Sequence, residues 1–296
     1  MPNKLTATTD TKEKALPPLP EREGIRAKHR MNLAMPMLPA VPAPVRRAAH
    51  SEIRRIITRR SGWMLAAICA AIGLVMTLLS AQTGSGPQSS GQIATGTATV
   101  GLYLALLVAV VASAVSGAGG TGGEYRYESM PLTVLFIPDR DLLFGAKLGV
   151  AAVYSLLLGL SAEIGSAIGL AALGHDKIVF GPQLVGAFGG GLLAAVCWAL
   201  IGASLGLLLR STAIAVTAVI GWCLVAEPLI WLIIKGIGIP SFAVLLPDSA
   251  TIGTVAVGSF TRSSFLAPSA ASAVVLILWT AAAGFAAWWY LRKREM

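Results

Sequence analysis

Long apolar segments alternate with shorter polar ones along most of the chain. A bilayer core about 30 Å thick requires about 20 apolar residues in a spanning helix. Six segments meet this requirement: 62–82, 98–118, 146–173, 183–209, 212–234 and 268–290. The pattern therefore predicts an all-α polytopic membrane protein with six transmembrane helices, which places both termini on the same side of the membrane.

The residues before the first apolar segment follow a different pattern. Residues 1–44 are rich in proline and charge and show no sustained period, which predicts a disordered, basic cytoplasmic tail. In residues 45–61 apolar side chains recur at helical spacing, and the arginines lie off that stripe. This segment is predicted to be an amphipathic elbow helix on the inner membrane surface. Residues 62–296 then form the predicted transmembrane domain.

Composition narrows the class of protein. Of the 296 residues 55% are hydrophobic and 12% are charged, and the mean hydropathy is +0.73. These values exclude an ordinary water-soluble enzyme. Lys and Arg number 23 against 14 Asp and Glu, and 13 of the bases lie in the first 60 residues. Because this basic segment precedes a hydrophobic body, we expect it to contact anionic lipid and to fix the topology, and we expect no nucleic-acid partner.

The distribution of basic residues also predicts the orientation. Lys and Arg prefer cytoplasmic loops close to the membrane. With the N-terminus inside, 20 of the 23 bases lie on the inner face, and only Lys177, Lys235 and Arg262 lie on the outer face. We therefore expect a multi-pass protein of the cell membrane with both termini in the cytoplasm.

Two connections between the predicted spans have an amphipathic character. The inner loop 119–147 begins with glycines and continues with alternating charged, aromatic and aliphatic residues, so its apolar face needs a cover, either the bilayer interface or a partner protein. The outer connection 236–267 is partly apolar but too short on each side of Pro247 and Asp248 to span the membrane. It is predicted to be a re-entrant outer hairpin with that polar pair as the turn at its tip.

Nucleotide and metal motifs give no positive indication. Residues 117–122 satisfy the pattern GxGxxG, but they follow a membrane span instead of a strand, so we interpret the glycines as the end of the second span. The chain contains no GxxxxGK[ST] sequence, so any ATP-driven work must come from another polypeptide. The three cysteines and three histidines have no metal-ligand spacing, and we expect no cofactor or metal.

Two carboxylates lie inside predicted spans, Glu163 in the third and Glu227 in the fifth. A charge in the membrane is costly, so each residue is a functional hypothesis by default. Both lie about 24 Å along helices that run from inside to outside, at 1.5 Å per residue. Two interpretations remain open: the acids line one outward-facing wet cavity, or each is a protonated or hydrogen-bonded structural acid. Pro228 is expected to kink the fifth helix beside Glu227.

The order of these features resembles the ABC-2-type permeases, the membrane subunits of ATP-binding-cassette exporters. The elbow, SEIRRIITRRS at 51–61, is similar to the family's opening of an acidic residue, basic residues and apolar residues. The inner loop resembles its coupling element, and the outer connection 236–267 resembles its re-entrant hairpin. The matching loop residues are Glu124, Tyr125, Arg126, Leu135, Pro138, Arg140 and Lys147. The resemblance covers residues 45–296.

The resemblance implies a permease without catalytic activity that pairs with a second copy, or with a paralogous permease, and docks a separate ABC ATPase subunit. It also implies export; the apolar composition of the spans favours an amphipathic or hydrophobic substrate. The inner loop carries both acidic and basic residues, which are suited to pair with opposite charges in a groove on a soluble ATPase. The candidate ATPase-coupling residues are Glu124, Tyr125, Arg126, Glu128, Pro138, Arg140 and Lys147.

Two functions from other classes remain as alternatives. A non-transporting membrane assembly or immunity factor would bind a partner through the inner loop but show no ATP-coupled flux. An intramembrane enzyme would use Glu163 or Glu227 as its acid or base, and the purified chain would then be active with no ATPase present.

Overall fold

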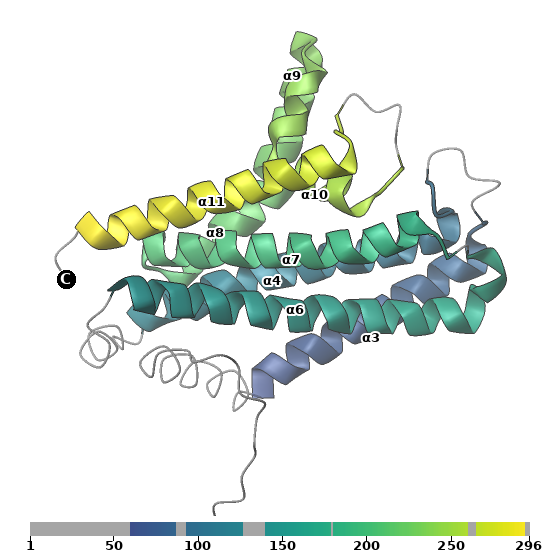
Figure 1. Cartoon of the computed structure of the whole chain (residues 1–296), viewed down its shortest axis with the longest axis horizontal. Coiled ribbons are helices and arrows are strands. Elements are labelled where there is room, and N and C mark those ends of the chain that lie inside the picture. The colour runs from purple at the N-terminus through teal and green to yellow at the C-terminus, as the bar shows by residue number, and fades with distance from the viewer. Residues whose placement is uncertain (1–59, 87–92, 127–139, 179, 260–264, 294–296) are drawn as a thin grey trace, which may run out of the picture. The chain divides into compact units, whose positions relative to one another are not determined.

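A computed structural model of the chain describes residues 60–86, 93–126, 140–178, 180–259 and 265–293. Within these residues the secondary structure is entirely helical (Figure 1). The long helices are α3 (Arg60–Thr83), α4 (Val100–Arg126), α6 (Arg140–Leu173), α7 (Pro182–Leu209), α8 (Thr212–Gly221), α9 (Glu227–Ile237) and α11 (Ser269–Lys293). The shorter elements are η2 (Thr97–Thr99), η3 (His175–Lys177), the π-helical turn η4 (Trp222–Ala226), η5 (Pro240–Leu245) and α10 (Pro247–Val255).

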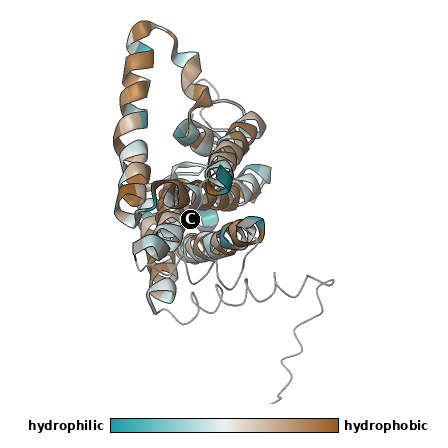
Figure 2. Cartoon of the chain, turned by 90° about the vertical axis from the view of Figure 1, so that its left-hand side faces the viewer, coloured by the Kyte–Doolittle hydropathy of each residue, from teal (hydrophilic) through white to brown (hydrophobic). Residues whose placement is uncertain are grey.

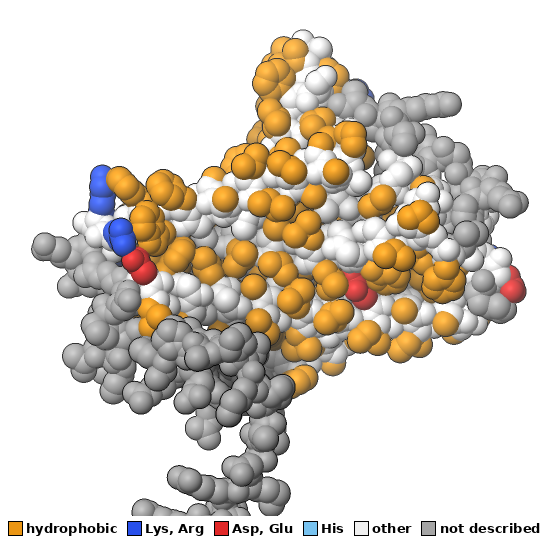
Figure 3. Space-filling model, viewed as in Figure 1, with side chains coloured by type: hydrophobic (Ala, Val, Ile, Leu, Met, Phe, Trp, Pro, Cys, Tyr) orange, Lys and Arg blue, Asp and Glu red, His pale blue; other side chains and the backbone are white. Residues whose placement is uncertain are grey.

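The six predicted spans are confirmed as helices that are long and apolar enough to cross a membrane. They cover Ser61–Thr83, Thr97–Gly123, Asp141–Leu173, Pro182–Leu209, Thr212–Ile237 and Ser269–Lys293. Apolar side chains are spread over the whole described surface seen in Figure 3, and a group of basic and acidic side chains lies at the end where α11 terminates. The tail 1–44 and nearly all of the predicted elbow 45–61 lie outside the described residues.

Helices α4 and α7 form the centre of the bundle and make the most extensive interhelical contact within it. Helix α3 packs mainly on α6, and α11 packs on α7 (Figure 1). The largest cluster of buried side chains lies between α4, α7, α8, α10 and α11, and it includes Leu102, Leu106, Trp198 and Leu276. These apolar residues therefore hold the bundle together from within, while others remain on its surface.

The structure corrects the predicted end of the second span. Helix α4 continues through the glycine-rich run to Arg126, so these glycines lie inside a helix. A Cβ atom at Gly117 would collide with the carbonyl oxygen of Ala199 on α7. The hydroxyl of Thr121 donates to the carbonyl oxygen of Ala203, 2.9 Å away. The run is therefore a site of close helix packing, where small residues let two backbones approach.

The same interface predicts a difference between two glycines of α7. A Cβ at Gly202 would collide with the carbonyl oxygen of Ala114 on α4, whereas a Cβ at Gly189 would meet nothing within 4 Å. Overpacking a close contact costs about 1–3 kcal/mol, so Gly202→Val should lower the thermal unfolding midpoint of the purified protein. Gly189→Val is the matched control and should leave the midpoint nearly unchanged. Equal shifts in the two variants would contradict this packing.

The fifth span changes direction near Pro228, as the sequence predicts, but the irregular turn comes just before it. A proline lacks the backbone N–H and its ring clashes with the carbonyl four residues earlier. The chain accommodates this in the π-helical turn η4, where the N–H of Glu227 donates to the carbonyl of Trp222. Beyond this turn α9 rises clear of the other long helices (Figures 1 and 2). Its principal neighbours are η4 and η5.

Candidate functional site

Glu227 holds the start of α10 against the start of α9. Its Oε1 accepts a hydrogen bond from the backbone N–H of Ser249 at 2.8 Å, and its Oε2 accepts one from the N–H of Asp248 at 2.9 Å. The indole Nε1 of Trp222 donates to Oε2 at 3.0 Å. The side chain of Glu227 is fully buried, with 0% exposed. A carboxylate here satisfies unpaired N–H groups at a helix N-terminus and complements the helix dipole.

The local sequence explains why α10 takes its cap from so far away. Leu246, the N-cap residue, has no side-chain oxygen, and Pro247 has no N–H to be satisfied. The free donors of the first turn therefore need an acceptor from elsewhere. The irregular turn before Glu227 places its carboxylate beside the N–H groups of Asp248 and Ser249, which lie 21 and 22 residues further along the chain.

Two further tryptophans attach the η5–α10 segment, residues 240–255, to the bundle. The Nε1 of Trp198 on α7 donates to the hydroxyl of Thr251 at 2.8 Å. The Nε1 of Trp279 on α11 donates to the carbonyl oxygen of Leu245 at 2.8 Å. Together with Glu227, these two indoles fasten the segment to three of the candidate spans.

The polar pair predicted as the tip of the outer hairpin stands between η5 and α10. Pro247 is buried and begins α10, so Pro247 and Asp248 form the start of a helix inside the protein. Burial, reinforced by the charge of Glu227, raises the pKa of Asp248 to about 7.

The two intramembrane acids lie in different surroundings. Glu163 lies on α6, which packs on α3, α4 and α7, whereas Glu227 lies at the junction of η4 and α9. Glu163 is 7% exposed, and its Oε1 has no hydrogen-bond partner among the described residues. Of the two interpretations left open for these acids, the hydrogen-bonded structural acid describes Glu227. The two acids thus lie on different elements, Glu163 within α6 and Glu227 at the start of α9.

The candidate coupling residues fall at the ends of two helices. Glu124 and Arg126 occupy the last turn of α4, and Arg140 is the first residue of α6. Glu128 and Pro138 lie outside the described residues. Lys147 belongs to the third turn of α6 and is only 5% exposed, so it lies inside the bundle instead of on its surface. The predicted inner loop 119–147 is thus helical at both ends.

Tyr125 takes part in an aromatic group at this end of the bundle. The guanidinium of Arg210 lies 5.5 Å from the ring centroid of Tyr125 on α4 and 5.5 Å from that of Tyr290 on α11. Arg210 ends α7 in the left-handed conformation, with φ at 50°. Cation–π contacts of this kind connect the ends of three helices.

An ion pair connects the start of α6 to the end of α11. Arg292 Nη2 lies 2.5 Å from Asp141 Oδ2, and the Nε1 of Trp288 donates to Asp141 Oδ1 at 2.9 Å. The guanidinium of Arg292 also lies 4.4 Å from the centroid of the Trp288 ring. We call these six residues, Tyr125, Asp141, Arg210, Trp288, Tyr290 and Arg292, the end clamp.

The end clamp was missed by sequence reasoning, which counted Arg210 and Arg292 only as charges that fix the topology. A signal was present, since an acid in the first turn of one span and a base in the last turn of another complement both helix dipoles.

Comparison of the chain with models of protein families and with proteins of curated function finds no match.

Proposed function

We propose that this chain is the permease subunit of an ABC-2-type exporter, driven by a separate ABC ATPase. In this proposal it lies in the cell membrane with both termini in the cytoplasm and pairs with a second permease. The elbow 45–61 lies on the inner surface, and η5 with α10 forms the re-entrant outer hairpin.

The observation that carries the proposal is the end clamp. Residues 127–139 connect the end of α4 to the start of α6, and the clamp fastens both of these helix ends. Tyr125 at one side contacts Arg210, and Asp141 at the other pairs with Arg292. An ATPase that bound this connection and changed conformation would therefore displace α4, α6, α7 and α11 together. Transmission of a conformational change into a membrane domain requires such a connected set of helices.

The surroundings of the two acids support a transport subunit over an intramembrane enzyme. Both oxygens of Glu227 already accept hydrogen bonds, and they hold a structural element in place. Glu163 is buried among apolar helices. Neither acid has the open approach that a general acid or base needs in order to reach a substrate.

The proposal is tested by purifying the tagged chain from its native membrane in mild detergent. We expect a P-loop ATPase to co-purify in stoichiometric amount and to hydrolyse ATP. A well-folded chain that carries no ATPase, or that carries a stable partner without a P-loop, would support the assembly or immunity factor. Activity of the purified chain alone would support the intramembrane enzyme.

A further inference from the structure

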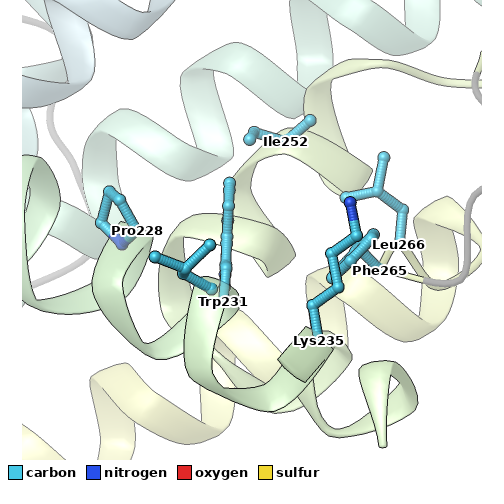
Figure 4. Close-up of a pocket in the computed structure, with 7 residues that line it drawn as sticks. Pro228, Trp231, Lys235, Ile252, Phe265 and Leu266 are labelled. Atoms are coloured by element: carbon cyan, nitrogen blue, oxygen red, sulfur yellow. The ribbon is translucent and has the colours of Figure 1, made fainter. Parts of the chain in front are cut away.

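A cavity of about 470 Å³ lies between α9, α10 and the residues that precede α11 (Figure 4). It is separate from the end clamp, and neither Glu163 nor Glu227 is among the residues that line it. Ligand pockets in proteins span about 300–1,000 Å³, so its volume suits a small ligand or part of a larger one.

One face of α9 contributes four of the seven described residues that line this cavity. Pro228, Trp231, Leu232 and Lys235 line it, and their spacing of three, four and seven residues places them on one side of the helix. At 1.5 Å per residue this wall is about 10 Å long. Ile252 of α10, with Phe265 and Leu266, closes the other side (Figure 4). Apart from Lys235, the described side chains that line the cavity are apolar.

Lys235 gives the cavity one polar end. Among the described residues that line the cavity, it is the only one with a charged side chain. Its side chain extends toward Phe265 and Leu266 (Figure 4), and no described residue pairs with its ammonium group. By the predicted orientation, Lys235 lies at the outer end of the fifth span, where a lipid headgroup would be. An apolar channel with a cation at the headgroup level complements an amphiphile of negative charge.

We infer that this cavity binds an acyl chain with an anionic headgroup, taken from the surrounding bilayer. The headgroup pairs with Lys235, and the chain lies along Trp231 and Leu232 toward Pro228. A neutral hydrocarbon would leave the ammonium without a partner, and an inorganic anion would leave the apolar walls unfilled. This inference does not depend on the proposed transport function.

The test uses the full chain in detergent micelles and a photoactivatable diazirine derivative of stearate. Mass spectrometry should locate the label on the α9 wall and at Phe265 or Leu266. Unlabelled stearate should compete with the probe, whereas stearyl alcohol and inorganic phosphate should not. Competition by the alcohol as strong as that by stearate, or competition by phosphate alone, would overturn the inference.

Two substitutions in the cavity and one control substitution make the test specific. Lys235→Gln should weaken competition by stearate about fivefold, since an exposed ion pair contributes up to about 1 kcal/mol. Lys293→Gln, at the opposite end of the bundle, is the charge control and should have no effect. Ile252→Trp should fill the cavity and remove the label from the α9 wall, and its thermal midpoint reports whether the chain remains folded. Unchanged labelling in a folded Ile252→Trp variant would also overturn the inference.

Discussion

Replacing Glu227 with alanine is expected to detach the η5–α10 segment from the bundle. The substitution leaves three buried or half-buried N–H donors without their acceptor: those of Asp248, Ser249 and Trp222. Each unsatisfied buried donor costs about 1–3 kcal/mol, so the free energy of unfolding should fall by roughly 3 kcal/mol or more. Unfolding in denaturant measures this loss, and hydrogen exchange at the amides of Asp248 and Ser249 locates it.

Glu163 supplies the matched control for this prediction. It is also an acid inside a candidate span, but its Oε1 has no partner among the described residues. Glu163→Gln should therefore leave the free energy of unfolding unchanged or raise it, because burying an ionisable group without a partner is costly. Glu227→Gln keeps one carbonyl oxygen and should fall between wild type and Glu227→Ala. Unchanged exchange at residues 248 and 249 in Glu227→Ala would contradict the capping role.

The double variant Glu124→Ala, Arg126→Ala is expected to uncouple the proposed ATPase from the membrane domain. Both residues occupy the last turn of α4, beside the connection on which the motor would act. Removing one partner of a buried interfacial charge pair costs about 2–5 kcal/mol, so affinity for the ATPase should fall more than tenfold. Co-purification from detergent and the ATP hydrolysis rate of the recovered complex measure the effect.

The control for the double variant is Asp176→Ala with Lys177→Ala. It removes the same two kinds of charge from the turn η3, which the predicted orientation places on the outer face. Insertion, dimer formation and ATP hydrolysis should match wild type in this control. The prediction would be contradicted if the Glu124→Ala, Arg126→Ala protein co-purified with as much ATPase as the wild-type protein does. The ATPase would then bind elsewhere on the chain.

The spans could be predicted from sequence because membrane helices must be long and apolar whatever they contact. The predicted segment 146–173, for example, lies within Arg140–Leu173 of the structure. The end of α4 could not be predicted in this way. Gly117 is compatible with both a helix end and a close helix contact, and only the backbone of Ala199 decides between them.

The candidate site was predictable in part. The cost of a buried charge singled out Glu227, but its role depends on the start of α10, which lies about 20 residues further along the chain. The residues next to Arg210 in the sequence do not indicate its cation–π contacts, because its partners Tyr125 and Tyr290 come from two other helices. Residues that act through such distant contacts are found only when the chain is folded.

The most direct test of the proposed function is photocross-linking from the end of α4 in living cells. Glu124 is replaced by p-benzoylphenylalanine in the tagged full chain, and adducts are identified by mass spectrometry after irradiation. The proposed permease predicts a covalent adduct with a P-loop ATPase that is absent when the photoactive residue stands at Asp176. Adducts with lipid only, or with a protein that has no nucleotide-binding motif, would contradict it.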